Sequence, residues 1–255
     1  MKKTIGLITL LSLYFLSYTQ TTDSTQTQAT SHFSGVITAT NNGISLLPNF
    51  MLGKPAALFD LSIGKKRLSF DPMLRFAMDG KPWVFVFWGR YKLVTNKKFT
   101  MSVGAHPAFV FRTVADTTNG NIKTYFTAQR YFAAETTPTY FFNKKLGVGI
   151  HYLYGHGLTK DLSQNTHFVG LKSIMSDLHL TKQFSLTFIP QFYYLRIDAQ
   201  EGLYANATVI LAKKNFPFSI SSIANKAINT EIAGKDFVWN VGLNYNFNNQ
   251  YIEAR

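Results

Sequence analysis

The sequence predicts an all-β protein, a closed antiparallel transmembrane β-barrel of about twelve strands. Only 15% of its 255 residues are charged, whereas ordinary soluble domains contain roughly 25%. Aromatic residues make up 15% of the chain, and large apolar residues alternate with polar residues or glycine at a period of two. A soluble sandwich would also alternate, but its outer face would carry more charge. The pattern therefore favours a barrel with its apolar face toward lipid.

The N-terminus has the three parts of a secretory signal peptide, to which we assign residues 1–19. Met1-Lys2-Lys3 is positive, residues 5–16 are apolar, and Ser17-Tyr18-Thr19 resembles a cleavage site. The apolar stretch is too short to span a bilayer comfortably, although an N-terminal anchor is the alternative. Residues 20–31 are polar and non-periodic, which predicts a disordered leader. Export combined with a transmembrane barrel indicates a Gram-negative envelope, with the mature protein in the outer membrane.

Alternation along the mature chain predicts the strands in order. The barrel is expected over residues 32–247, with strands at 32–40, 56–64, 67–78, 83–94, 99–113, 122–142, 146–156, 166–180, 184–196, 203–212, 216–223 and 236–247. Twelve is an even number, as bacterial single-chain barrels require. The span 122–142 is long and contains Pro138. Prolines inside three other strands, Pro72, Pro107 and Pro190, predict either bulges or a register that differs from the simple alternation, because each removes a ladder donor.

The connections between these strands alternate in kind. Every second one is a short basic turn, and the five turns together hold ten of the 26 Lys and Arg residues. The other connections are mostly longer, at 41–55, 79–82, 114–121, 157–165, 197–202 and 224–235. Short turns are periplasmic in outer-membrane barrels, so both termini are expected at the periplasmic rim.

Charged residues at inward-facing positions are the candidate functional residues. Strand parity places six of them in the lumen: Asp60, Asp71, Arg75, Arg90, Lys92 and Arg112. Four cations against two anions would favour anions in an open pore, since charged rings set selectivity. The other interpretation is a salt-bridged plug that conducts nothing, because twelve strands lie between filled small barrels and open porins.

Simple hairpins would place three of these charges in one row. Closure at residues 64–67 sets Asp60 opposite Asp71, and closure at 79–82 sets Asp71 opposite Arg90. Neighbouring Cβ atoms would then be about 5 Å apart. Arg90 would offset the repulsion between the carboxylates by charge-assisted hydrogen bonds.

The last strand resembles the C-terminal insertion signal of bacterial outer-membrane β-barrels. Asn240, Gly242, Tyr245 and Phe247 occupy the places of that signal, which is followed here by a short tail at residues 248–255. The Asn/Lys turns and the abundance of Phe and Tyr are similar to barrels of the Bacteroidota. The resemblance implies insertion by the barrel assembly machinery and implies no activity.

Several other classes of function are disfavoured. The chain has no cysteine, and its six histidines lack metal-ligand spacing, so we expect no metal and no cofactor. The net charge of +13 is dispersed over turns, which argues against nucleic-acid binding. An enzyme that acts on lipid would need Ser163, His156 or His167 near the outer rim, but no local motif marks them.

The expected function is therefore porin-like passage of small, anionic solutes, without catalysis. The alternative is a non-conducting barrel that serves as a subunit of a larger outer-membrane complex for secretion, nutrient uptake or barrel assembly. The expected partners are outer-membrane lipid, lipopolysaccharide, the barrel assembly machinery during insertion and, in the alternative, other envelope proteins.

Overall fold

The computed structural model describes residues 30–45, 47–118 and 121–252. The expected signal peptide and most of the expected leader lie outside these residues. The strands are β1 (Thr30–Thr40), β2 (Ala56–Lys65), β3 (Leu68–Ala77), β4 (Pro82–Thr95), β5 (Phe99–Thr118), β6 (Asn121–Thr136), β7 (Thr139–Phe141), β8 (Leu146–Gly157), β9 (Thr166–His179), β10 (Phe184–Ile197), β11 (Gln200–Lys213), β12 (Phe218–Thr230) and β13 (Phe237–Ile252). One 3₁₀ turn, η1 (Pro48–Phe50), lies between β1 and β2. No helix among the described residues is long and apolar enough to cross a membrane.

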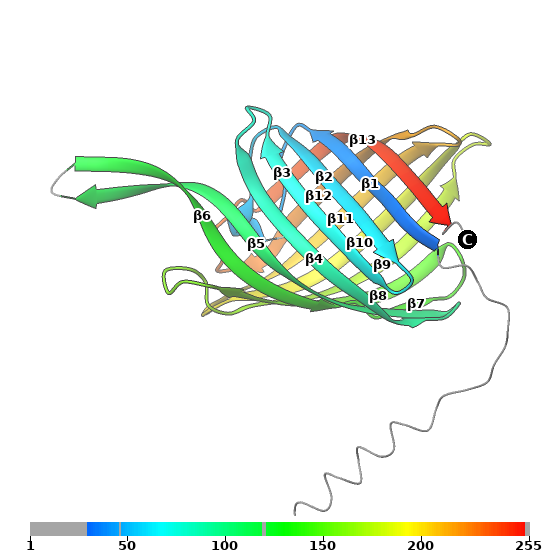
Figure 1. Ribbon diagram of the computed structural model, residues 1–255, viewed down its shortest axis with the longest axis horizontal. Helices are drawn as coiled ribbons and strands as arrows, with labels where there is room; N and C mark the ends of the chain where they lie inside the picture. Colours follow the sequence, from blue (N-terminus) through cyan, green and yellow to red (C-terminus); the bar gives the residue numbers. More distant parts are fainter. Residues whose placement is uncertain (1–29, 46, 119–120, 253–255) are drawn as a thin grey trace, which may run out of the picture.

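The strands form a closed antiparallel barrel (Figure 1). β1 pairs with both β2 and β13, and β4 pairs with both β3 and β5, so the sheet has no free edge. β7 continues β6 beyond Thr137 and Pro138, and both segments pair with β5 and β8. Counting β6 and β7 as one span reduces thirteen segments to twelve. The expected twelve-stranded barrel is confirmed, with the expected span at 122–142 interrupted at Pro138.

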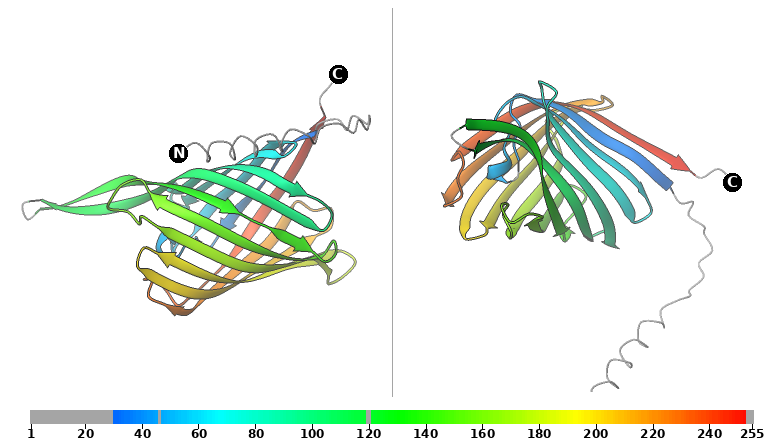
Figure 2. Two further views of the ribbon diagram at one scale, coloured as in Figure 1. Left: turned by 90° about the horizontal axis from the view of Figure 1, so that it is seen from below. Right: turned by 60° about the vertical axis from the view of Figure 1, so that its left-hand side comes forward.

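Several strands are longer than the alternation predicts. β13 continues to Ile252 and pairs with β1 as far as Thr30, so residues 248–252 belong to the barrel wall and not to a tail. β5 and β6 pair out to Thr118 and Asn121, and this hairpin projects well beyond the rim in Figures 1 and 2. The expected loops at 114–121, 197–202 and 224–235 are therefore largely strand. The alternation pattern predicts strands that are too short, because backbone pairing continues through polar residues that show no alternation.

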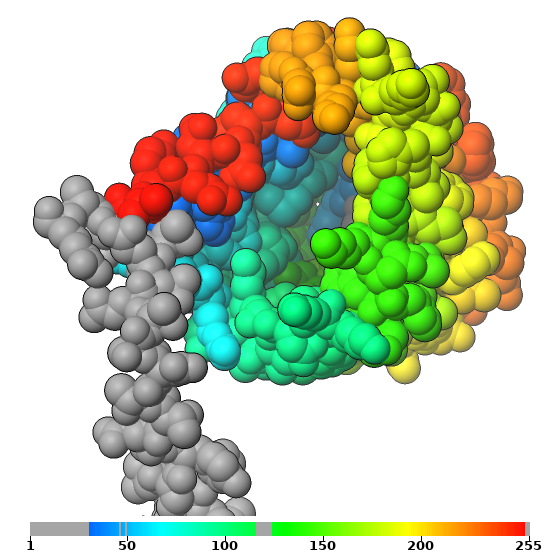
Figure 3. Space-filling view, turned by 90° about the vertical axis from the view of Figure 1, so that its right-hand side faces the viewer, coloured from blue at the N-terminus to red at the C-terminus, as the bar shows by residue number. Residues whose placement is uncertain are grey.

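The two rims still differ as expected. The five basic turns alternate along the chain with the other connections, and antiparallel pairing places each set at its own rim. The turn rim also holds the start of β1 and the end of β13, and it is hollow in the space-filling view (Figure 3). The largest connection, 41–55, lies at the opposite rim, where the Lys54 ammonium lies 3.0 Å from the Asp79 carboxylate. This ion pair holds the pKa of Asp79 below its ordinary value and links the first loop to the second.

The prolines do not produce the expected bulges. Each pairs in register with one neighbour, as Pro72 with Phe87, Pro107 with Phe132 and Pro190 with Ala207. Pairing with the other neighbouring strand is interrupted at the proline, but the register is the same before and after the gap. A strand residue directs its N–H and C=O to one side only, so the missing donor affects one ladder and leaves the other intact. The expectation of bulges at Pro72, Pro107 and Pro190 is wrong.

The register shifts lie elsewhere, and the shift at the start of β4 affects the lumen. Arg75 pairs with Val84 but Phe76 pairs with Pro82, so Trp83 is an additional residue in β4. Both Trp83 and Val84 then face inward, and Trp83 is only 4% exposed. Such a bulge changes the direction of a side chain without ending the strand.

The outer surface of the barrel is apolar. Along β13 the exposed residues Trp239, Val241 and Leu243 alternate with the buried residues Asn240 and Asn244. Aromatic side chains form two rows across neighbouring strands. Near the turn rim, Phe216, Phe218, Tyr245, Phe247 and Phe33 follow one another at ring centroid distances of 5.1–6.3 Å. Toward the loop rim, Phe59, Phe76, Phe85, Phe111 and Phe126 do so at 5.0–6.0 Å. An apolar belt bounded by aromatic rows is typical of a barrel in lipid.

The alternation of rims predicts the orientation in the membrane. The chain has no cysteine, so Lys97→Cys in a turn and Lys235→Cys in a loop each provide one labelling site, and both positions are exposed. We expect a membrane-impermeant maleimide to label Lys235→Cys in intact cells and Lys97→Cys only after the outer membrane is permeabilised. Labelling of both variants from the same side would contradict the assignment of the rims.

Candidate functional site in the lumen

The inward positions of β2 to β5 hold the six expected charged residues. Asp71 and Arg90 form an ion pair of 2.9 Å between Oδ2 and Nη1, and Asp60 and Arg75 lie 3.5 Å apart. Lys92 is in step with Arg90 along β4, and the Arg112 guanidinium carbon lies 5.4 Å from the centre of the Phe50 ring. The lumen therefore contains all six residues, but not in the expected row.

The pairing of Asp60 opposite Asp71 is wrong. Asp60 lies opposite Met73, because the turn places Lys65 opposite Leu68 with Lys66 at a φ of 58°. Asp71 lies opposite Trp88, because the loop closes between Ala77 and Lys81 rather than at 79–82, and the extra residue at Trp83 then shifts the register by one. Arg90 still reaches Asp71, as a diagonal neighbour across the ladder. The expected contact between Asp71 and Arg90 is confirmed, and Asp60 pairs with Arg75 instead.

The second carboxylate bound by Arg90 belongs to Glu135 on β6. Arg90 Nε donates to Glu135 Oε1 at 2.7 Å, although β5 lies between β4 and β6. Gly104 of β5 lies opposite both residues and leaves the space that the Arg90 side chain crosses. A Cβ atom at Gly104 would lie 3.0 Å from Arg90 Cγ and 3.1 Å from Trp88 Cε3. The contact between Arg90 and Glu135 therefore depends on a glycine at this position.

Hydrogen bonds extend this ion pair in both directions around the wall. On one side, Ser62 Oγ donates to Asp71 Oδ1 at 2.6 Å and lies 2.9 Å from His32 Nε2. On the other side, His151 Nε2 lies 2.9 Å from Glu135 Oε2. We call these six residues the lumen belt: His32, Ser62, Asp71, Arg90, Glu135 and His151. The belt joins β1, β2, β3, β4, β6 and β8, about half of the barrel circumference.

Lys172 adds a cation beside the belt. Its ammonium is close enough to Glu135 and Arg90 to interact electrostatically, but it forms no ion pair with a described residue. Inward charge then consists of five cations (Arg75, Arg90, Lys92, Arg112 and Lys172) and three carboxylates (Asp60, Asp71 and Glu135), a difference of +2. Lumen charge is therefore positive, as the sequence predicts, but with two members that it does not identify.

Glu135 and Lys172 could not be placed in the lumen from the sequence alone. Both lie on strands whose parity is ambiguous without the structure, since β6 passes through Pro138 and the apolar residues of β9 fall on both faces. In the structure, Glu135 lies on the same face of β6 as the buried Ala133, and Lys172 lies on the same face of β9 as the buried Phe168. His106 and His151 also face the lumen.

The rest of the lumen wall is uncharged. On β13, β12 and β1 it presents amides and hydroxyls, with Thr38 Oγ1 donating to Asn244 Oδ1 at 2.8 Å. On β9 to β12 a group of rings fills part of the interior, where Tyr193 stacks on Tyr204 at 4.9 Å and Tyr193 Oη donates to Asn225. The free space of the lumen toward the loop rim therefore lies beside β3 to β6.

The residues of the expected insertion signal divide between the two faces of β13. Asn240 and Gly242 face inward, where Asn240 Oδ1 accepts a bond from the backbone N of Ile223. Tyr245 and Phe247 face outward in the aromatic row near the turn rim. Tyr245 and Phe247 therefore lie on the apolar face of the barrel. The role of the four residues in insertion stays a prediction.

The candidate lipase residues are engaged elsewhere. The His156 ring bonds to the carbonyl oxygen of Gln164, and His167 Nδ1 lies 3.0 Å from Tyr152 Oη. No hydrogen bond joins Ser163 to a histidine among the described residues. The same residues include no group of three or more His, Asp or Glu side chains placed to hold a metal ion.

Comparison with known proteins identifies the fold. No protein-family model matches the chain, and no curated protein matches it. Among solved structures, the KdgM porin matches with a TM-score of 0.50 at 10% identity over 84% of this chain and 99% of that one. The NanC porin matches at 0.49 and 11% identity over 86% and 100%. An outer-membrane channel from Pseudomonas putida F1 matches at 0.48 and 10% identity over 87% and 95%.

The fold of this chain is that of an outer-membrane β-barrel. The comparison with the KdgM porin and the apolar outer face agree on this point. The outer-membrane location expected from the sequence follows from the same two observations.

Removal of Arg90 should destabilise the barrel. Arg90→Ala leaves Asp71 and Glu135 in the partly desolvated lumen without their shared cation, and we expect a loss of about 1–3 kcal/mol. Urea unfolding of the purified barrel measures this loss. Lys92→Ala is the matched control, because Lys92 lies on the same strand, is exposed and has no ion pair with a described residue. Equal stability of the two variants would show that the belt does not hold the strands together.

The space at Gly104 provides a second test of the belt. Gly104→Ala places a methyl group against Arg90 and Trp88, so we expect a lower unfolding midpoint in urea. Gly89→Ala is the control, because a Cβ atom there would meet only Ala105 O, at 3.8 Å. A midpoint that is unchanged in Gly104→Ala would mean that Arg90 does not need this passage.

Proposed function

We propose that this chain forms a porin-like channel for small, anionic solutes in the outer membrane. The observation that carries the proposal is the positive balance of inward charge, concentrated on β3 to β5 and β9. Charges that line a pore set its ion preference. A closed barrel with an apolar exterior and a hollow turn rim supports a path through the interior (Figure 3). The fold shared with the KdgM porin supports the same class of function.

Two kinds of cation contribute differently to this preference. Arg75 and Arg90 lie beside carboxylates, so their charge is largely balanced within the wall. Lys172 has no ion-pair partner among the described residues, and Lys92 is exposed toward the turn rim. A passing anion would therefore meet less balanced charge at the two lysines than at Arg75 and Arg90.

The orientation and partners follow from the same proposal. The turn rim faces the periplasm, and the loop rim with its projecting β5–β6 hairpin faces outward among lipopolysaccharide. Tyr245 and Phe247 would serve the barrel assembly machinery during insertion. No enzymatic step is part of the proposal.

Charge substitution at Lys172 tests the proposal directly. In planar bilayers under a salt gradient, the native barrel should show a reversal potential on the anion-selective side. Lys172→Met removes the charge with little change in length, so it should reduce the preference, and Lys172→Glu should abolish or invert it.

Two outcomes would contradict the proposal. An unchanged reversal potential in Lys172→Glu would show that inward charge does not set selectivity. Silent bilayers despite verified insertion would favour the non-conducting subunit of a larger envelope complex.

A further inference from the structure

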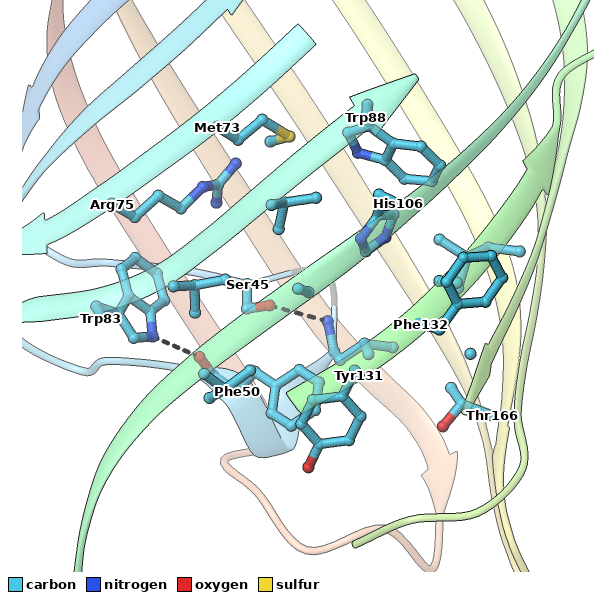
Figure 4. Close-up of a pocket in the computed structure, with 18 residues that line it drawn as sticks. Ser45, Phe50, Met73, Arg75, Trp83, Trp88, His106, Tyr131, Phe132 and Thr166 are labelled. Carbon is cyan, nitrogen blue, oxygen red and sulfur yellow. Dashed lines mark hydrogen bonds between the residues drawn. The ribbon is translucent and has the colours of Figure 1, made fainter. Parts of the chain in front are cut away.

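An aromatic cavity of about 200 Å³ lies in the lumen toward the loop rim, between the lumen belt and the loop at 41–55 (Figure 4). Its walls come mainly from β3 to β6 and from the loop at 41–55, and Leu153, Gly155 and Thr166 of β8 and β9 complete the lining. The rings that line it are Phe50, Trp83, Trp88, His106 and Tyr131. We propose that this cavity binds a one-ring aromatic carboxylate on its way through the channel, an inference that rests on the proposed function for access to the site.

The loop contributes a fixed outer wall to this cavity. The indole Nε1 of Trp83 donates to the carbonyl oxygen of Phe50 at 2.9 Å, and the Phe50 ring meets Tyr131 edge-on at 5.2 Å. The Arg112 guanidinium carbon lies 5.4 Å from the centre of the same ring. Three contacts from three strands therefore hold Phe50 over the cavity, so the site is formed before a ligand arrives.

The size and lining of the cavity select a ring. A dry cavity of about 150 Å³ that is lined by apolar side chains binds benzene. The present cavity is somewhat larger, so it has room for one ring with a small substituent. Aromatic walls favour an aromatic ligand, because ring pairs at 4.5–7 Å contribute about 0.5–1.5 kcal/mol beyond the area that they bury.

Two polar side chains select the substituent. His106 is 7% exposed, and its Nδ1 has no hydrogen-bond partner within the described protein. Buried polar atoms without a partner cost free energy, and in the tautomer that carries its proton on Nδ1 the imidazole would donate to a ligand oxygen. The Arg75 guanidinium also lines the cavity, with its carbon 5.9 Å from the centre of the Trp83 ring, and its other neighbour is the Asp60 carboxylate at 3.5 Å. A donor and a cation at one apolar cavity favour a carboxylate on the ring.

Tryptophan fluorescence reports this site selectively. Two of the three tryptophans, Trp83 and Trp88, line the cavity, and Trp239 is 52% exposed on the outer face. In a Trp239→Phe background, sodium benzoate should change the emission of the detergent-purified barrel in a saturable way. Sodium acetate, which lacks the ring, should cause no saturable change. Benzyl alcohol, which lacks the charge, should bind at least tenfold more weakly than benzoate.

Two variants separate recognition from folding. His106→Phe keeps a ring but removes both nitrogens, and it should weaken benzoate binding about tenfold while the heat-modifiable migration of the barrel is retained. Phe50→Ala removes the outer wall and should weaken benzoate and benzyl alcohol alike. A linear benzoate titration, saturation by acetate, equal binding of benzyl alcohol or an unchanged affinity in folded His106→Phe would each overturn the site.

The outcome is distinguishable from that of the channel proposal. Anion-selective conductance without saturable benzoate binding removes the site and leaves the channel. Saturable benzoate binding to a barrel that is silent in bilayers leaves the site and removes the channel.

Discussion

The guanidinium of Arg90 binds two carboxylates from strands that are not neighbours, and the inner wall of the barrel is organised around it. Asp71 lies on β3, which pairs with the strand of Arg90, and Glu135 lies on β6, which β5 separates from that strand. Taking one of these charges away would leave the others uncompensated at partly buried positions, so the three are interdependent. Ser62 and His151 continue the same chain of contacts toward β1 and β8. The belt therefore couples the side chains of strands whose backbones meet only through their neighbours.

Two small departures from regular structure make room for this arrangement. Gly104 removes the side chain that would stand between Arg90 and Glu135. The additional residue at Trp83 shifts β4 against β3 and turns one indole into the lumen, where it holds the first loop. The belt and the aromatic cavity thus share their supporting strands. An ionic wall and an apolar recess lie next to each other, which is the combination that a solute with a ring and a charge requires.

The lumen is divided rather than uniformly polar. The rings of Phe168, Tyr193 and Tyr204 fill the interior beside β9 to β11, and uncharged amides and hydroxyls cover β12, β13 and β1. Charge and free space are concentrated near β3 to β6. A solute that crosses the barrel would follow this side, so specificity would depend on few side chains. The same division leaves a cavity beside β3 to β6 in a barrel whose opposite side is filled with side chains.

The sequence by itself determined the barrel, its twelve spans, the two kinds of rim and the inward side of six charged residues. These features follow from period-two alternation and turn chemistry, which are local and act at every residue. The structure decided the register, because one extra residue at Trp83 or one two-residue turn at Lys66 shifts every later pairing. It also decided which charges meet: Arg90 binds Glu135 across a strand, and Asp60 binds Arg75 rather than lying opposite Asp71. Contacts between residues that are far apart in the chain depend on closure of the whole sheet, and no local pattern encodes them.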